Sequence, residues 1–159
     1  MLALRASGPY LLPPMALETT LILFKPDAIQ GNLVGTVLER YQKAGFTVRG
    51  IKMMELSDEI LAEHYSHIAD MPFFPDVRAF MQETPVIALA LSGEDVINKV
   101  RDLLGPTDSC VAEAGTIRGD FGVKDSNSKM RNVCHASDSS ESAAAELKRF
   151  FNDREIFDL

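Results

Sequence analysis

The chain has 159 residues, which suits one domain and is long enough to bury a sizeable core. Lys and Arg number 16 and Asp and Glu 23, so the formal net charge of −7 argues against a sequence-independent nucleic-acid binder. An apolar fraction of 46% indicates neither a disordered chain nor a membrane protein.

The first 17 residues superficially look like a targeting segment. Gly and Pro residues at positions 8, 9, 13 and 14 interrupt every apolar run there, so no secretory signal is predicted. Cys110 and Cys134 provide neither a disulfide framework nor a paired metal-ligand spacing, which favours a reducing, cytoplasmic setting. We expect residues 1–17 to be a loosely ordered extension and residues 18–159 to form a single domain.

From residue 18 onward, apolar strands alternate with amphipathic helices. Buried strands are predicted at 21–24 and 86–91, and a strand with both buried and exposed side chains is predicted at 46–56. Helical spacing predicts helices over 33–41, 60–68, 94–104 and 139–151, whereas 116–123 reads as loop and strand. The alternation indicates an α/β layer architecture and leaves the strand order open.

The segment 132–139 places His135 between a short apolar stretch and the start of a helix. Asp138 or Ser139 can cap that helix, and Glu141 occupies the position of a capping-box acid. Imidazole is the side chain best suited to act as a nucleophile or proton carrier near neutral pH. A lone histidine is more often a core or capping residue, but the polar neighbours of His135 favour function.

Positive side chains at the ends of elements are candidates for binding phosphate, because phosphoryl transfer mainly needs positioned cations. Arg101 lies near a helix end, Arg118 follows a Thr-Ile pair, and Arg131 precedes Asn132. Taken singly, each of these reads as a solvated surface charge. Lys25 is the exception, because an ammonium directly after four apolar residues is costly to bury without an anionic partner.

Glu146 lies three residues after Ala143 and four before Phe150, at the border of the apolar stripe of the last helix. A carboxylate there can hold one ring nitrogen of a nearby imidazole as an N–H donor and leave the other free to attack. The alternative is a surface glutamate paired with Arg149 on the next turn.

The segment 132–139, NVCHASDS followed by a helix containing a Glu, resembles the active-site signature of the nucleoside diphosphate kinases. Four further motifs occur in the order of that family: Lys25-Pro26-Asp27, His64-Tyr65, Pro72-Phe73-Phe74 and the run GTIRGDF at 115–121. The resemblance covers the chain from about residue 18 to residue 151. It implies an α+β sandwich with a ferredoxin-like βαββαβ core, a four-stranded antiparallel sheet and additional helices.

The resemblance also implies a ping-pong transfer of the γ-phosphoryl group from a nucleoside triphosphate to a nucleoside diphosphate through a phosphohistidine on His135. The implied catalytic residues are His135, Glu146, Lys25, Tyr65 and Ser137, and the implied nucleotide-binding residues are Lys25, Phe73, Arg101, Thr107, Arg118 and Asn132. Glu146 would orient the imidazole, Ser137 would contact Glu146, and Phe73 would stack on the base. Tyr65 and Phe73 are otherwise ordinary core candidates.

The implied cofactor is Mg²⁺ carried by the nucleotide phosphates, with no metal ligands from the protein. The absence of a Walker-type Gly-rich loop is consistent with a phosphate site built from side chains. The implied partners are nucleotides and further copies of the chain, with no membrane and no nucleic acid. The number of subunits stays open.

The chain departs from the family pattern at several positions. The resemblance begins after Met15, which suggests that Met15 is the natural start. Ala136 stands where members commonly have Gly, and the segment between residues 121 and 132 is longer than usual, which we interpret as a lengthened surface hairpin or loop over 124–130. Ser109 and Ala114 stand where prolines are frequent, in a loop that packs between subunits in the family.

Two other function classes compete with the kinase. The chief rival is a catalytically weak relative that acts as an interaction or regulatory module on the same fold. An RNA-binding ferredoxin-like domain is disfavoured by the net charge of −7 and by the lack of an aromatic-basic stretch. Every expected catalytic and phosphate position is filled, which favours the enzyme.

Overall fold

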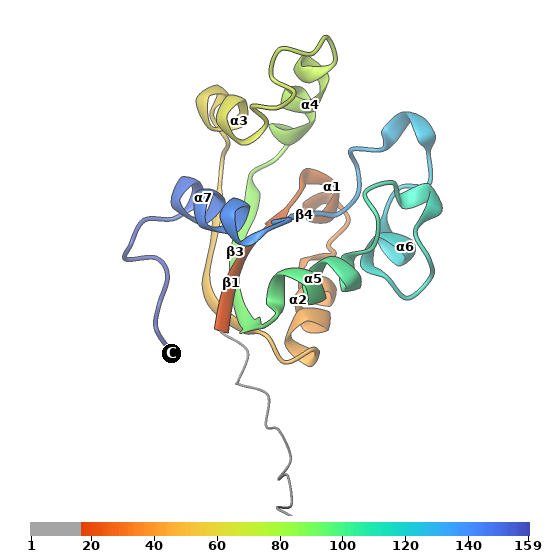
Figure 1. Cartoon of the computed structure of the whole chain (residues 1–159). Helices are drawn as coiled ribbons and strands as arrows, with labels where there is room; N and C mark the ends of the chain where they lie inside the picture. The colour runs from red at the N-terminus through yellow and green to blue at the C-terminus, as the bar shows by residue number, and fades with distance from the viewer. Residues whose placement is uncertain (1–16) are drawn as a thin grey trace, which may run out of the picture.

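A computed structural model describes residues 17–159, so the predicted N-terminal extension lies outside the described residues except for its last residue, which opens the first strand. These residues form a four-stranded antiparallel sheet in the order β2-β3-β1-β4. The strands are β1 (Leu17–Phe24), β2 (Thr47–Met54), β3 (Val86–Glu94) and β4 (Cys134–Ala136). The sheet and its added helices confirm the predicted ferredoxin-like α+β architecture (Figure 1).

Helices fill the connections between the strands. They are α1 (Pro26–Gln30), α2 (Val34–Lys43), α3 (Asp58–His64), α4 (Phe74–Met81), α5 (Val96–Leu104), α6 (Ile117–Phe121) and α7 (Ser140–Phe150), with short 3₁₀ turns η1 (Ser109–Val111) and η2 (Ser126–Ser128). Within residues 17–159, no helix is long and apolar enough to cross a lipid bilayer.

Local structure differs from the sequence prediction in several places, and the helix predicted over 60–68, for example, ends at His64. The prediction of loop and strand over 116–123 is wrong, because the Thr116 hydroxyl accepts a hydrogen bond from Gly119 N at 3.0 Å and starts α6. Helix α4 lies where the sequence predicted no helix, and it tolerates Pro75 because proline is accepted in the first helical turn. Ser139 caps α7, which leaves Glu141 one position short of a capping-box acid.

β1 is buried on both faces and separates two apolar clusters. Ile22 and Phe24 join the cluster beneath α2 and α5, whereas Leu21 and Leu23 join the cluster beneath α3, α4 and α7. Successive strand side chains point to opposite faces, so one apolar run serves both layers. Figure 1 shows α2 and α5 on one side of the sheet and α7 on the other.

β4 is the short edge strand that carries His135. Cys134 and Ala136 are buried in the α2/α5 cluster, so the alternation of the strand turns His135 toward α3 and α7. His135 pairs with Leu23 of β1 in the sheet register. The histidine is therefore fixed by the sheet at its backbone while its ring, with a side-chain exposure of 25%, can be reached from outside.

Candidate functional site

A strained residue directly precedes β4. Val133 is fully buried and has a φ of 76°, which is unfavourable for a β-branched side chain by about 1–3 kcal/mol. Its N–H donates to Asp27 Oδ2 at 2.9 Å, and its carbonyl accepts from Lys25 N at 3.0 Å. These two bonds fix the bend that brings β4 into register beside β1. The sequence reading noted Asp27 as part of a motif but missed this role.

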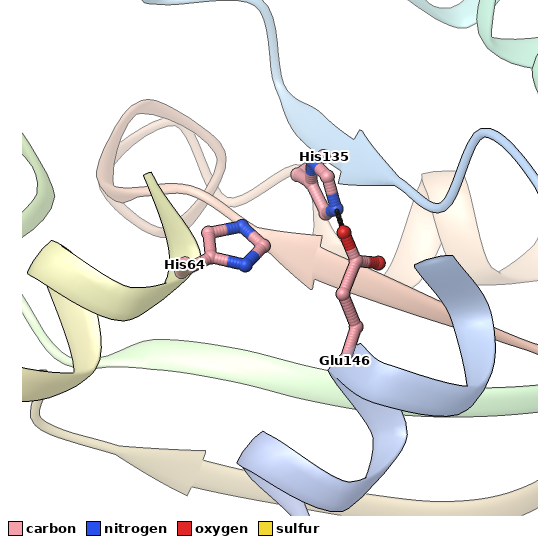
Figure 2. Close-up of side chains that lie close together, drawn as sticks. All are labelled: His64, His135 and Glu146. Carbon is pink, nitrogen blue, oxygen red and sulfur yellow. Dashed lines mark hydrogen bonds and ion pairs between the residues drawn. The ribbon is translucent and has the colours of Figure 1, made fainter. Parts of the chain in front are cut away.

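His135 is held by a chain of hydrogen bonds that starts at the backbone of β1. Its Nε2 lies 3.0 Å from Glu146 Oε1 (Figure 2), and Glu146 Oε2 accepts from the Ser137 hydroxyl at 2.6 Å. Ser137, itself fully buried, accepts from Leu21 N at 3.2 Å. Because the Glu146 carboxylate can only accept, the proton of His135 resides on Nε2 and the lone pair of Nδ1 stays available.

A second histidine packs against the first. The His64 ring lies edge-on to the His135 ring, with centroids 4.5 Å apart (Figure 2), and its Nδ1 is 3.3 Å from Arg149 Nη1. Burial, with a further contribution from nearby positive charge, lowers the pKa of His64 to about 2. His64 is therefore a neutral buttress for the catalytic candidate. The sequence placed His64 in a predicted helix and in the His64-Tyr65 motif, and no role was predicted for it.

Two buried cations lie at the base of the site. Lys25 Nζ donates to Asn132 Oδ1 at 2.8 Å and to Met130 O at 3.2 Å, and burial lowers the pKa of Lys25 to about 8. Arg118 donates to the carbonyls of Asn132 at 3.1 Å, Gly105 at 3.1 Å and Cys134 at 2.7 Å. An ammonium has three donors and a guanidinium five, so both groups keep N–H bonds free for a ligand.

These side chains surround a cavity of about 470 Å³. Arg101 and Thr107 line it from α5 and the following loop, and Tyr65 lines it from the end of α3. Across residues 17–159, Lys25, Arg101 and Arg118 have no ion-pair partner, although the chain as a whole is acidic. Unpaired cations converging on a concave site are suited to binding a polyphosphate.

The structure brings together most of the residues singled out by sequence. The cavity is lined by Lys25, Tyr65, Arg101, Thr107, Arg118, Asn132, His135 and Glu146. Ser137 lies behind Glu146 and acts on the site only through it. Phe73 does not line the cavity; it is the N-cap residue of α4 and is 46% exposed.

The only His/Cys/Asp/Glu group in residues 17–159 with ligand atoms close enough for a metal is His64, His135 and Glu146, within 4.8 Å of one another. This set has two imidazoles and one carboxylate, and that carboxylate already bonds His135 and Ser137. Mg²⁺ prefers an octahedral shell of oxygens. The donor set of this group therefore does not match the ligands that Mg²⁺ prefers.

The sequence model described as nucleoside diphosphate kinase matches residues 18–156. A relative from Parabacteroides distasonis, named nucleoside diphosphate kinase, is 46% identical over 142 residues, which are 89% of this chain and 90% of the relative. The Halobacterium salinarum enzyme in complex with CDP superposes with a TM-score of 0.84 at 35% identity, covering 89% of this chain and 92% of that one. A transition-state mimic of the Borrelia burgdorferi enzyme with vanadate and ADP gives a TM-score of 0.81 at 32% identity, covering 90% and 92%.

Proposed function

Because this chain belongs to the nucleoside diphosphate kinase family, we propose that His135 is the residue that carries the phosphoryl group. The enzyme transfers the γ-phosphoryl group of a nucleoside triphosphate to a nucleoside diphosphate. The observation that carries the assignment is the His135–Glu146–Ser137 chain at the floor of a cavity with three unpaired cations. This chain of hydrogen bonds leaves Nδ1 of His135 unprotonated, beside cationic side chains that can bind phosphate.

In the first half-reaction, the lone pair of His135 Nδ1 attacks the γ-phosphorus. A P–N bond forms, the bond from phosphorus to the β–γ bridging oxygen breaks, and its electron pair leaves on the nucleoside diphosphate. Charge develops on the phosphate oxygens, where Lys25, Arg101 and Arg118 provide donors. Glu146 stabilises the positive charge that the ring gains, through the Nε2–H bond at 3.0 Å.

In the second half-reaction, the terminal oxygen of another nucleoside diphosphate attacks the phosphorus. The P–N bond breaks and its electron pair returns to Nδ1, so the enzyme regains its starting state. Both nucleotides use one cavity and one set of cations, which is the reason for ping-pong kinetics. Phe73 is the proposed stacking partner of the base, and its exposed ring is suited to any base because every base has a π-face.

We propose Mg²⁺ as the cofactor, carried by the nucleotide phosphates. When bound, the ion screens charge on the polyphosphate and fixes its conformation. The chain's own contribution is then to bind the remaining oxygens with Lys25, Arg101 and Arg118. Asp138 lines the cavity and pairs with no Lys or Arg among residues 17–159, so its carboxylate would be available to attract the ion.

Further proposals concern the whole protein. We propose that residues 18–159 act as one catalytic domain that forms a homo-oligomer and works in the cytoplasm. Self-association is supported by edge strand β2, where Ile51 and Met53 are 49% and 57% exposed. The cytoplasmic setting is supported by the free thiols of Cys110 and Cys134.

Incubation with γ-labelled ATP tests the function. The parent chain should take up a label that is acid-labile and base-stable, and it should release the label to an added nucleoside diphosphate. His135→Ala should take up none, whereas the control His67→Ala, which removes an exposed imidazole from the same cavity, should label normally. Label on the His135 variant would contradict the assignment, and an unlabelled parent would favour the catalytically weak relative.

A further inference from the structure

The lengthened part of the chain is residues 122–131, which we name the linking segment; it joins α6 to Asn132. Its two ends are closed by a hydrogen bond from Val123 N to Arg131 O at 3.1 Å. Within it, the Asp125 carboxylate accepts from Asn127 N at 2.9 Å and caps η2. The segment is thus a loop with its own short 3₁₀ turn, the second of the two alternatives, hairpin or loop, that the sequence left open.

The ammonium of Lys124 connects two elements of the candidate site. Lys124 Nζ donates to Ser109 O, in the loop that carries Thr107, and to Arg118 O at 3.2 Å, in α6. The side chain itself is exposed and does not line the cavity. One ammonium therefore bonds to a carbonyl of each element and links the two, while its charge stays outside the cavity.

The linking segment also lies directly against this loop. A Cβ built on Gly122 would meet Ser109 Oγ at 2.0 Å, so no larger residue fits without displacing the loop. The loop is otherwise anchored by Asn132 Nδ2 on Thr107 O at 2.8 Å and by Arg118 Nη1 on Gly105 O at 3.1 Å. Lys124 thus supplies the anchor at the far side of Thr107, next to Ser109.

Lys129 offers a contrast within the same segment. Its ammonium pairs with Asp108 Oδ2 at 3.1 Å, but the two side chains are 59% and 31% exposed, respectively. Exposed ion pairs contribute little because water screens them. Lys124 instead donates to backbone carbonyls of two different elements, and these carbonyls also accept from Ala112 N at 3.3 Å and Gly122 N at 3.0 Å, so what Lys124 adds is the link between the elements.

We propose that Lys124 is a positioning residue for phosphoryl transfer. It fixes the loop of Thr107 relative to α6, so that Thr107 and Arg118 reach the same nucleotide phosphates. This inference rests on the proposed role of Thr107 and Arg118 in nucleotide binding. A small displacement of either group from the phosphates weakens binding, because positioned contacts lose strength steeply with misplacement.

The test compares Lys124→Met with Lys129→Met, since each removes one ammonium from the linking segment. In Lys124→Met, the ADP dissociation constant and the nucleotide KM should rise about five- to tenfold, the scale of one lost hydrogen bond of ordinary strength. The kcat at saturating nucleotide should change by less than about threefold, because the His135–Glu146 pair is untouched. Lys129→Met should match the parent, and Lys124→Arg should restore most of the affinity.

Gly122→Ala gives a second, independent displacement of the loop and should raise the same dissociation constant. A lower melting temperature with unchanged ADP affinity in Lys124→Met would overturn the inference, because the role would then be purely structural. Equal losses in the Lys124 and Lys129 variants would also overturn it, since general charge would explain both. ADP affinity is measured without turnover, so this result is independent of whether the parent forms a phosphoenzyme.

Discussion

Glu146→Gln isolates the charge of the group that orients His135. The amide keeps the shape of the side chain and can still accept from His135 Nε2–H, while its NH₂ faces the Ser137 hydroxyl in place of Oε2. Hydrogen bonds to a charged group contribute about 1.5–3 kcal/mol and neutral ones about 0.5–1.5 kcal/mol. The hydrogen bond between residue 146 and His135 should therefore lose about 1–1.5 kcal/mol of its strength. The loss should be about twice as large if the weakened bond to Ser137 also lets the Gln side chain shift.

At about 1.4 kcal/mol per factor of ten, the rate of phosphoenzyme formation should fall about ten- to a hundredfold. Rapid-quench measurement with γ-labelled ATP gives this rate directly, free of nucleotide release. Glu141→Gln is the matched control, because Glu141 lies on the same helix, is exposed, and its side chain makes no hydrogen bond within residues 17–159. A Glu146 variant within about twofold of that control would refute the orienting role of the carboxylate.

Further predictions concern binding and stability. Lys25 binds phosphate only when protonated, so nucleotide affinity should fall as the pH rises above the Lys25 pKa of about 8. Lys25→Arg should keep its affinity over the same pH range, and a flat pH profile of the parent chain would contradict this reasoning. Because this pKa lies below the ordinary 10.5, the folded chain should gain stability, measured by urea unfolding, as the pH rises from about 8 to 10.5. Ser137→Ala should reduce the free energy of unfolding by about 1–3 kcal/mol, because Leu21 N loses its acceptor, and an unchanged melting curve would contradict this. The same variant should slow labelling less than Glu146→Gln does. Phe73→Ala should weaken binding of purine and pyrimidine nucleotides alike by about 1–3 kcal/mol, with stability unchanged because the ring is 46% exposed; calorimetric titration would reveal any preference for one base.

Much of this protein follows from short-range sequence pattern. The apolar run 21–24 predicted a strand buried on both faces, and both faces are covered. The position of Glu146 beside the apolar stripe of the last helix allowed an inward carboxylate or a surface one, the family resemblance favoured the first, and its side chain is 12% exposed and bonded to His135. These inferences succeed because strand and helix periods fix which face a residue occupies before any partner is known.

Only the tertiary structure decided which partners meet. Lys25 and Met130, or Ser137 and Leu21, are more than a hundred residues apart, and their contacts depend on the register of β4 against β1. That register depends in turn on the strained backbone of Val133, which no propensity favours. The packing of His64 against His135 and the link that Lys124 makes between the Thr107 loop and α6 likewise arise from contacts between distant segments. The sequence by itself thus determined the residues of the site, and the fold determined their geometry.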